Sequence, residues 1–508
     1  MAYQYEFWTE TAGDLSEKRS HIDTPTKHDQ AGAGYKIIID PSIKKQNWIG
    51  AGAALTDAAA SLIWKQTPSQ RHALLTELFE PDQGDFSLIR LPMGSCDFGS
   101  GEVSKTKYYS YDDAPYDKPD LELKNFSIGE GEVGSPSASK DLKYIVPVLQ
   151  EILKINPAVK ILATPWSAPA WMKDTKEMTN GGHFRDDIAR HDLLKCYAQY
   201  FIKFIEAYQK LGIPIHNLAI QNEPNCPTPW PAMIWTMRQL TEFGYKYLRP
   251  ALDVSFPSVG IYLWDGSLDQ VTQQNLSENI DSVAKNAFSG FAFHTYVGPY
   301  QNAVQAKRFN PNWEVSMTER RCMMKETVAD ASHIMMGMIG SDLVRQGISS
   351  IYLWNLALDE RGLPNIAGST GRRGVITINH KTGQVMRNLE YYMLRNFTQD
   401  VENGSTVIES SSYMKCDYAN ILGTKYYGGL SSVAFLGPDD EISAQIYNPT
   451  DQELKATVRI NQFGAKWQDV TVPAYGTVTL HKANKPINES KPGKDETFKL
   501  NPMKANLA

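Results

Sequence analysis

The sequence predicts an α/β fold, a (β/α)8 TIM barrel with an accessory antiparallel β-sandwich domain. Two observations predict it. Between about residues 47 and 390, short apolar segments alternate with amphipathic segments of helical period, as in a parallel sheet covered by helices. After about residue 395, apolar and polar residues alternate between Pro, Gly, Asp and Asn, which is typical of antiparallel strands.

The composition is that of a soluble globular protein. The 508 residues are 42% apolar and 21% charged, which excludes disorder as a global description. The 51 basic and 57 acidic residues give a net charge of -6, and without a long basic run nucleic acid is not an expected partner. No stretch of 18 apolar residues occurs, so we expect no transmembrane segment.

Strands and helices alternate along the predicted barrel. Its helices are indicated by apolar residues recurring at steps of three and four, as in Leu194, Tyr197, Phe201, Ile205 and Tyr208, and in Leu142, Ile145, Val146, Leu149 and Ile152. The predicted strands are residues 47–55, 86–94, 160–167, 217–224, 260–266, 290–296, 314–320 and 350–358.

The remaining segments complete the predicted organisation. Residues 1–46 read as strands and are expected to pair with the C-terminal β-sandwich, 393–486, leaving 47–392 as the catalytic barrel. Residues 487–508 are rich in Lys, Pro and Asn and are predicted to be a mobile tail. The long loop 99–137, with Tyr108, Tyr109, Tyr111 and Tyr116, is predicted to lie on the substrate side.

Polar and aromatic residues follow most of the predicted strands. In this architecture the carboxyl ends of the strands form the rim that holds the active site. The residues at or just beyond these ends are Asp57, Trp166, Glu223, Asp265, His294, Glu319 and Trp354.

Two of these residues suggest a chemistry. Glu223, in the segment Gln221-Asn222-Glu223-Pro224, ends the fourth strand, and Glu319 ends the seventh. Two carboxyls facing each other across one barrel are what retaining glycoside hydrolysis requires. The sequence has no HExxH and no GxSxG, and Gly50-Ala51-Gly52 lacks the third glycine of a dinucleotide-binding loop. We therefore expect no metal and no organic cofactor.

Several longer strings resemble family 30 of the glycoside hydrolases, in the branch that contains acid β-glucosidase (glucosylceramidase). They occur in the order of that family along the whole barrel. They are GAGAALTDAAA (50–60), IRLPMGSCDF (89–98), ATPWSAPAWMK (163–173), AIQNEP (219–224), FHTYVG (293–298), SMTE (316–319) and LWNLALDERGLPN (353–365), with YNPT and VPAYGTVTL in the sandwich.

The resemblance implies roles for individual residues. Glu223 would be the general acid/base and Glu319 the nucleophile. Substrate would be bound by Asp57, Trp166, Asn222, His294, Tyr296, Trp354 and Asn355, with Arg90 and Asp97 behind them. It implies hydrolysis of β-glucosides, either glucosylceramide-like or with aryl or alkyl leaving groups. A β-1,6-glucanase, a β-xylosidase and a non-catalytic sugar-binding protein are the alternatives.

Some positions depart from the family pattern. Ala51, Ala53 and Thr295 replace residues usual there, and Arg320-Arg321 follow the predicted nucleophile where smaller residues are common. These changes leave the aglycone open, and the substrate is expected to be a small glycoside or a glycolipid. Five widely spaced cysteines and no visible signal peptide favour a cytoplasmic location. A secreted protein whose signal peptide has been removed is the alternative.

Overall fold

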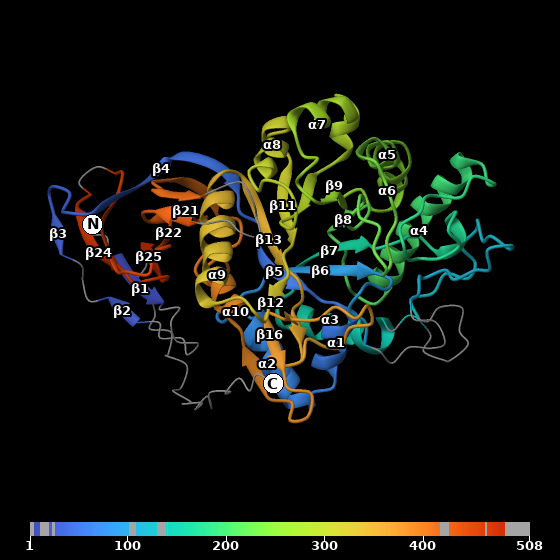
Figure 1. Cartoon of the computed structure of the whole chain (residues 1–508), viewed down its shortest axis with the longest axis horizontal. Coiled ribbons are helices and arrows are strands. Elements are labelled where there is room, and N and C mark those ends of the chain that lie inside the picture. The colour runs from blue at the N-terminus through green and yellow to red at the C-terminus, as the bar shows by residue number, and fades with distance from the viewer. Residues whose placement is uncertain are drawn as a thin grey trace.

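Eight parallel strands close into a barrel at the centre of the protein (Figure 1). The computed structural model describes residues 5–10, 20–22, 26–100, 108–129, 139, 141–416, 426–462 and 465–482. Each barrel strand pairs with the next along the chain, and β13 pairs with β5 to complete the ring. The barrel strands are β5 (Gly50–Ala54), β6 (Leu88–Met93), β7 (Lys160–Pro165), β8 (Asn217–Ala219), β9 (Gly260–Gly266), β10 (Gly290–His294), β11 (Glu314–Glu319) and β13 (Ile348–Leu353). The predicted barrel is confirmed.

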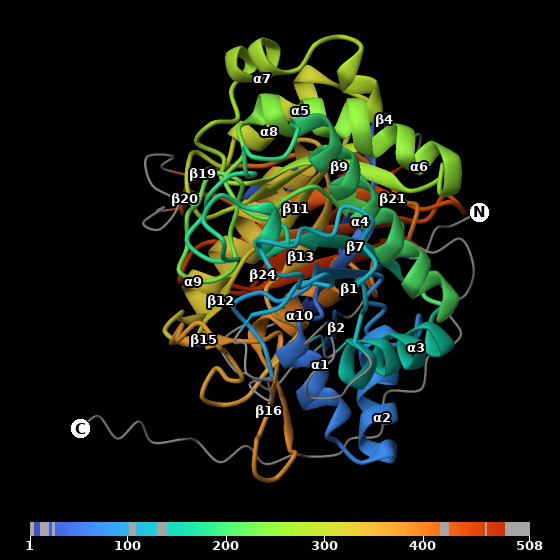
Figure 2. The same ribbon diagram turned by 90° about the vertical axis from the view of Figure 1, so that its right-hand side faces the viewer.

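Helices surround the barrel, with α1 to α3 on one flank and α5 to α8 on the opposite one (Figure 2). They are α1 (Asp57–Trp64), α2 (Pro68–Phe79), α3 (Val146–Ile155), α4 (Arg190–Lys210), α5 (Met237–Phe243), α6 (Arg249–Ser255), α7 (Gln273–Asn279), α8 (Asn302–Phe309), α9 (Val328–Ser332) and α10 (Leu389–Arg395). Shorter 3-10 segments are Ala170–Met172 and Ala284–Ala287, and π-helical segments are Asp141–Ile145, Gly244–Leu248 and His333–Leu343.

The apolar face predicted for α4 is buried along its length, including Leu194 and Tyr208. The face predicted for 142–152 is buried except at its start, where Leu142 is 40% exposed. The first turn of that segment is π-helical, which changes the angle between successive side chains and turns Leu142 to solvent.

Glycine allows the first two barrel strands to approach closely. A Cβ atom on Gly52 would lie 1.8 Å from the carbonyl oxygen of Leu88 on β6. The Gly50-Ala51-Gly52 segment therefore serves backbone packing inside the barrel, as the missing third glycine indicated.

A ten-stranded sheet lies beside the barrel (Figure 1). Its order is β2–β1–β25–β22–β21–β18–β4–β23–β24–β3, and it surrounds one apolar core to which strands of both halves contribute. The pairing is antiparallel except between β4 and β23, which are parallel. The predicted β-sandwich domain is confirmed, with this one parallel pair as an addition. Its strands are β1 (Tyr5–Glu10), β2 (Ser20–Ile22), β3 (Lys27–His28), β4 (Tyr35–Asn47), β18 (Thr406–Ser410), β21 (Ser431–Leu436), β22 (Ile442–Tyr447), β23 (Leu454–Ile460), β24 (Trp467–Val472) and β25 (Thr477–Lys482).

The N-terminal strands are built into this sheet. β1 pairs with β25 over six residues, β3 pairs with β24, and β4 lies between β18 and β23 before the chain enters the barrel. The predicted tail, 487–508, lies outside the described residues.

One aromatic cluster joins the sheet to the barrel. The Trp48 indole N–H donates to the carbonyl of Phe397 (3.0 Å), and its ring packs edge-on against Phe435 of β21 at 5.6 Å between ring centres. These residues belong to the main barrel core, so the two domains share apolar packing.

Short strands pair outside the barrel and the ten-stranded sheet. They are β12 (Cys322–Met323) with β15 (Arg372–Arg373), β14 (Ala357–Leu358) with β16 (Ile376–Ile378) and β17 (Val385–Arg387), and β19 (Met414–Cys416) with β20 (Tyr426–Gly428).

Candidate active site

Glu223 and Glu319 meet at the carboxyl ends of the barrel strands. Glu319 is the last residue of β11 and lies in register with His294, the last residue of β10. One atom each of Glu223, His294 and Glu319 lie within 4.8 Å of one another. The Glu223 side chain is 17% exposed and that of Glu319 is 9% exposed, so both carboxyls are mostly buried but remain in contact with solvent.

The backbone around Glu223 is strained. Its φ is +44°, and φ is +69° at Asp265 on the neighbouring strand, a region that non-glycine residues rarely adopt. The Glu223 N–H donates to the Asp265 carbonyl (2.9 Å), which holds the two strained residues together. Such strain is concentrated at functional sites, where the surrounding structure over-determines the backbone.

Arg90 is the central cation of the site. Its guanidinium is fully buried and donates to Oε2 of Glu319 (2.6 Å), Oδ1 of Asn222 (2.7 Å) and Oδ2 of Asp265 (2.9 Å). A buried charge of this kind is tolerated because carboxylates surround it. Arg90 therefore fixes the carboxylate of Glu319 and the amide of Asn222 relative to each other.

His294 is a second cation in the same cluster. Its ring nitrogens lie 3.2 Å from Oε1 of Glu223 and 3.2 Å from Oδ1 of Asp265. Burial lowers the His294 pKa, but the charge of Glu319 and the bonds to Asp265 and Glu223 outweigh it and raise the pKa to about 9. Burial likewise raises the pKa of Asp265, and the charge of Arg90 reverses this so that the net pKa is lowered.

Tyr296 completes the surroundings of Glu319. Its hydroxyl donates to Oε1 of Glu319 (2.9 Å), so that both oxygens of this carboxylate accept hydrogen bonds. On Glu223, by contrast, Oε2 has no hydrogen-bond partner among the described residues. The two carboxyls thus differ: Glu319 is held on both oxygens, and Glu223 keeps one oxygen available.

Two tryptophans form an apolar wall. The rings of Trp166 and Trp354 are stacked at 5.2 Å between centres, and the guanidinium of Arg90 lies 4.8 Å from the Trp166 ring centre. Both side chains are almost completely buried, so they present little more than an edge to a ligand. Tryptophan offers a sugar ring both apolar area and an N–H group.

The remaining predicted binding residues surround this wall. Asp57 begins α1, and its Oδ2 accepts the backbone N–H of Ser100 (2.6 Å). Because Oδ1 of Asn222 is occupied by Arg90, its NH₂ group is the part that a substrate hydroxyl can meet. Asn355 is turned toward Thr56, whose hydroxyl donates to its Oδ1 (2.7 Å). Since Thr56 caps α1, Asn355 positions the start of the helix that carries Asp57.

Two tyrosines of the long loop fasten it to the barrel core. Tyr109 and Tyr111 are buried in the barrel core and donate to Asp141, so they anchor the loop and do not face a substrate. Residues 101–107 and 130–138 of the predicted loop lie outside the described residues.

Asp97 also lies near the site, as the resemblance implied. Burial, together with the charge of Glu319, raises its pKa well above the ordinary value. Arg372 approaches Asp97 and Glu319 from a position after the last barrel strand, where no sequence pattern marked it.

Glu223, His294 and Glu319 are residue types that can also bind metal ions. A protonated imidazole has no lone pair to give to a metal ion, and the charges around His294 raise its pKa to about 9. A metal ion would therefore have to displace a ring proton of His294 before it could bind there.

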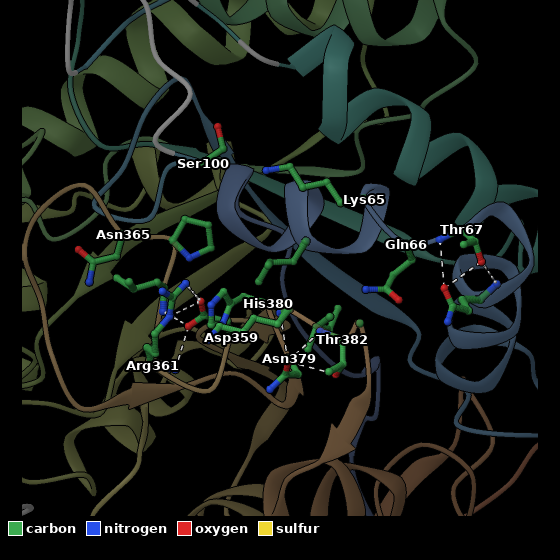
Figure 3. Close-up of a pocket in the computed structure, with 17 residues that line it drawn as sticks. Lys65, Gln66, Thr67, Ser100, Asp359, Arg361, Asn365, Asn379, His380 and Thr382 are labelled. Carbon is green, nitrogen blue, oxygen red and sulfur yellow. Dashed lines mark hydrogen bonds and ion pairs between the residues drawn. The ribbon is translucent and has the colours of Figure 1, made fainter.

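A polar cavity of about 590 Å³ lies beside α1 (Figure 3). Ser100 lines it and links it to Asp57, while Arg361 is held there by Asp359. The Oε1 atom of Gln66, which also lines the cavity, has no hydrogen-bond partner among the residues that the structure describes. This cavity adjoins the site but contributes none of the predicted catalytic residues.

A search of the described helices for one long and apolar enough to cross a membrane finds none. The described cysteines Cys96, Cys196, Cys226 and Cys322 are free thiols.

The chain was compared with known proteins. It is 29% identical over 447 residues to an endo-1,6-β-D-glucanase of Neurospora crassa, covering 85% of each chain. It is 24% identical over 470 residues to the lysosomal acid glucosylceramidase of Mus musculus, covering 89% of this chain and 84% of that one. The crystal structure of SrfJ from Salmonella typhimurium superimposes with a TM-score of 0.80 at 25% identity, covering 95% of this chain and 100% of that chain.

Both domains match one family description. Residues 49–400 match the glycosyl hydrolase family 30 TIM-barrel domain, and residues 404–480 match the glycosyl hydrolase family 30 beta sandwich domain. These matches cover most of the chain and include every residue of the site described above. The chain belongs to glycosyl hydrolase family 30.

Proposed function

We propose that the protein is a retaining β-glycosidase that hydrolyses β-glucosides through a covalent glycosyl-enzyme. The observation that carries the proposal is the approach of Glu223 and Glu319, with one oxygen of each within 4.8 Å. Retaining enzymes have carboxyls about 5–5.5 Å apart, whereas inverting enzymes need about 6.5–9.5 Å to admit a water molecule. The observed approach supports retention.

The surroundings of each carboxyl support its role. Arg90 and Tyr296 both donate to Glu319, so that both of its carboxylate oxygens are held in place for attack on the anomeric carbon. The unbonded Oε2 of Glu223 can present a proton to the leaving oxygen. We therefore take Glu319 as the nucleophile and Glu223 as the acid/base.

The reaction then has two steps. Glu319 attacks the anomeric carbon while Glu223 gives its proton to the departing glycosidic oxygen, and a glycosyl ester forms on Glu319. The ester neutralises the charge of Glu319, and Glu223, now ionised, takes a proton from water as that water attacks the anomeric carbon. Two inversions leave the configuration retained, and Glu223 is protonated again.

Anion rescue tests both roles. In Glu223→Ala, an activated aryl glucoside should still form the glycosyl-enzyme, and azide should then attack it and give the β-glucosyl azide. In Glu319→Ala, azide should attack the substrate directly and give the α-azide. NMR of the anomeric proton identifies each product, and the opposite pair of anomers would reverse the roles.

Glu314→Gln is the matched control. Glu314 lies on the same strand as Glu319 but at its other end, where the Tyr262 hydroxyl donates to it (2.6 Å). This variant should keep its activity within about twofold. If all three variants hydrolyse nitrophenyl β-glucoside as well as the parent, the proposed catalytic pair is wrong.

The substrate class is a second part of the proposal. The relatives include both a glucosylceramidase and an endo-1,6-β-D-glucanase, so glucose is the sugar common to their names. Rates on nitrophenyl β-glucoside, nitrophenyl β-xyloside and linear β-1,6-glucan separate the options. We expect the glucoside to be cleaved faster than the xyloside, and a faster xyloside would contradict a glucosidase.

A further inference from the structure

Four arginines lie on or next to the short β12–β15 ribbon beside the site. Arg320 pairs with Glu326, and Arg373 pairs with Glu390 at 2.7 Å. Arg321 and Arg372, in contrast, form no ion pair with any described residue. The ribbon thus holds two compensated arginines and two without a carboxylate partner.

The two uncompensated arginines face the catalytic residues. The guanidinium of Arg321 lies 5.0 Å from the ring centre of Tyr296, the residue that donates to Glu319. The backbone of Arg321 also forms a bridge with Trp354 at the end of β13. Burial and the positive charge of Arg321 lower the pKa of Arg372, whereas Tyr296, Asp97 and Glu319 act in the opposite direction.

Their position corresponds to the leaving-group side of the site. Of the two oxygens of Glu319, Oε1 accepts from Tyr296 and lies 4.0 Å from Nδ1 of His294, the atom that contacts Glu223. Tyr296 is therefore on the same side of Glu319 as the acid/base. Arg321, 5.0 Å from the Tyr296 ring, therefore lies on the side of the acid/base, which in a retaining enzyme stands next to the departing oxygen.

We propose that Arg321 and Arg372 bind an anionic group, a carboxylate, sulfate or phosphate, on the leaving group of the substrate. This inference rests on the proposed glycosidase function and specifies its substrate. The two guanidinium groups are half-buried and repel each other. An oxyanion that accepts hydrogen bonds from both would remove this repulsion. Among the described residues, the Nη1 atom of Arg372 has only the sulfur of Met323 as a hydrogen-bond partner (2.7 Å), a weak acceptor that an oxyanion would replace.

The experiment compares two aryl β-glucosides that differ in one group. One has a carboxylate on the phenyl ring and the other has a carboxamide at the same position. The measured quantity is the ratio of kcat/KM for the carboxylate substrate to kcat/KM for the carboxamide substrate, which cancels differences in folded enzyme. We expect a ratio above one for the parent protein.

Each arginine should contribute to that ratio. In Arg321→Gln and in Arg372→Gln the ratio should fall roughly tenfold, the effect of one charge-assisted hydrogen bond. Arg308→Gln is the control, because Arg308 is an exposed arginine of α8 near the other end of the barrel, and its ratio should equal that of the parent. Higher salt should lower the ratio of the parent.

Each outcome is decisive. A parent ratio of one or less, or a ratio unchanged in both arginine variants, would overturn the inference while leaving the glycosidase intact. No hydrolysis of either substrate would instead overturn the proposed function. If a variant does not fold, competitive inhibition of the parent by benzoate but not by benzamide supports the site, and equal inhibition by both contradicts it.

Discussion

Two buried clusters of carboxylates in this barrel differ in the groups that surround them. At the active site, Asp265 and Glu319 are bonded by the cation Arg90, and His294 adds a second positive charge. Behind the long loop, the side chain of Asp141 accepts hydrogen bonds from neutral hydroxyls only, as far as the described residues go, at 2.7 Å from Tyr111 and 2.5 Å from Tyr208. Asp265 and Asp141 are equally inaccessible to solvent.

Asp265 and Asp141 are thus equally buried, but their pKa values shift in opposite directions. Cations reverse the effect of burial at Asp265, so its pKa is lowered. At Asp141 burial prevails over the hydrogen bonds from Tyr208 and Tyr111, and the pKa is raised to about 6. A buried carboxylate kept charged by cations can orient the reacting groups around it, whereas one bonded by hydroxyls in the core stabilises structure.

Asp141 with Tyr111 and Tyr208 (the hydroxyl cluster) has a structural role, as the contacts of Tyr111 indicate. Tyr111 stacks on Phe204 of α4 at 5.6 Å between ring centres, and its N–H donates to the hydroxyl of Tyr200. These contacts fasten residues 108–129 to α4, whereas connecting loops are generally more mobile than the elements they join. The cationic cluster, Arg90 and His294 with their carboxylates, orients the reacting groups. The hydroxyl cluster fastens the long loop to α4.

Removing the central cation should have the largest effect. Arg90→Met leaves Glu319 and Asp265 buried without compensation, so we expect the free energy of unfolding to fall by about 3–5 kcal/mol. Turnover should fall about 10²-fold or more, because Glu319 and Asn222 lose the group that aligns them. Urea unfolding and initial rates measure the two losses.

An exposed cation provides the control for Arg90. Lys246 pairs with Glu242 on the surface at 3.0 Å, with its side chain 57% exposed. Lys246→Met should leave the unfolding free energy close to that of the parent, because an exposed ion pair contributes little. If Arg90→Met were no more damaging than this, the cluster would not depend on charge compensation.

Most of the barrel and the strand ends could be predicted from the sequence, for physical reasons. Alternating strands and helices identify a barrel, and a barrel places strand ends at one rim, so Glu223 and Glu319 could be expected to meet. Arg90 had a signal too, since it is a charged residue inside an apolar strand. The resemblance then added roles that periodicity alone does not supply.

What could not be predicted depends on loops and on contacts distant in sequence. Asp141 meets Tyr208 from 67 residues away, so no local pattern indicated that tyrosines of the long loop are buried against it. Arg372 reaches the site from a two-residue strand with no detectable period. The parallel pairing of β4 with β23 joins residues more than 400 positions apart, which no local pattern encodes.

Replacing Asp141, the carboxylate bonded by tyrosine hydroxyls, should have an intermediate effect on the free energy of unfolding, and this effect should depend on pH. The pKa of Asp141 is raised from 3.8 to about 6 on folding, so its contribution to stability is fully present below about pH 3.8 and is lost as the pH rises through 6. Asp141→Asn cannot lose a proton. The unfolding free energy of the variant relative to the parent should therefore increase by about 2–3 kcal/mol between pH 4 and pH 7.

Tyr208→Phe sharpens this test, because it removes one hydroxyl donor from the charged form of Asp141. Its stability should fall more steeply than that of the parent over the same pH range. A difference between Asp141→Asn and the parent that does not change with pH would mean that Asp141 is ionised in the folded protein, like the carboxylates of the active site.

The smallest effect should come from His294, through the titration of the cationic cluster. Its pKa is raised from 6.5 to about 9 on folding, so the stability that it contributes is fully present below about pH 6.5 and is lost as the pH rises through 9. We expect the parent to lose about 1–2 kcal/mol over this range, since the titration is shared with Glu223, Asp265 and Glu319. His294→Gln has no proton to lose there and should show a flatter dependence of melting temperature on pH.

The two clusters would then respond at different pH, the hydroxyl cluster below 7 and the cationic cluster above it. A parent and a His294→Gln variant with parallel melting profiles between pH 6.5 and 9.5 would show that His294 is neutral in the folded protein and that Arg90 alone compensates the carboxylates.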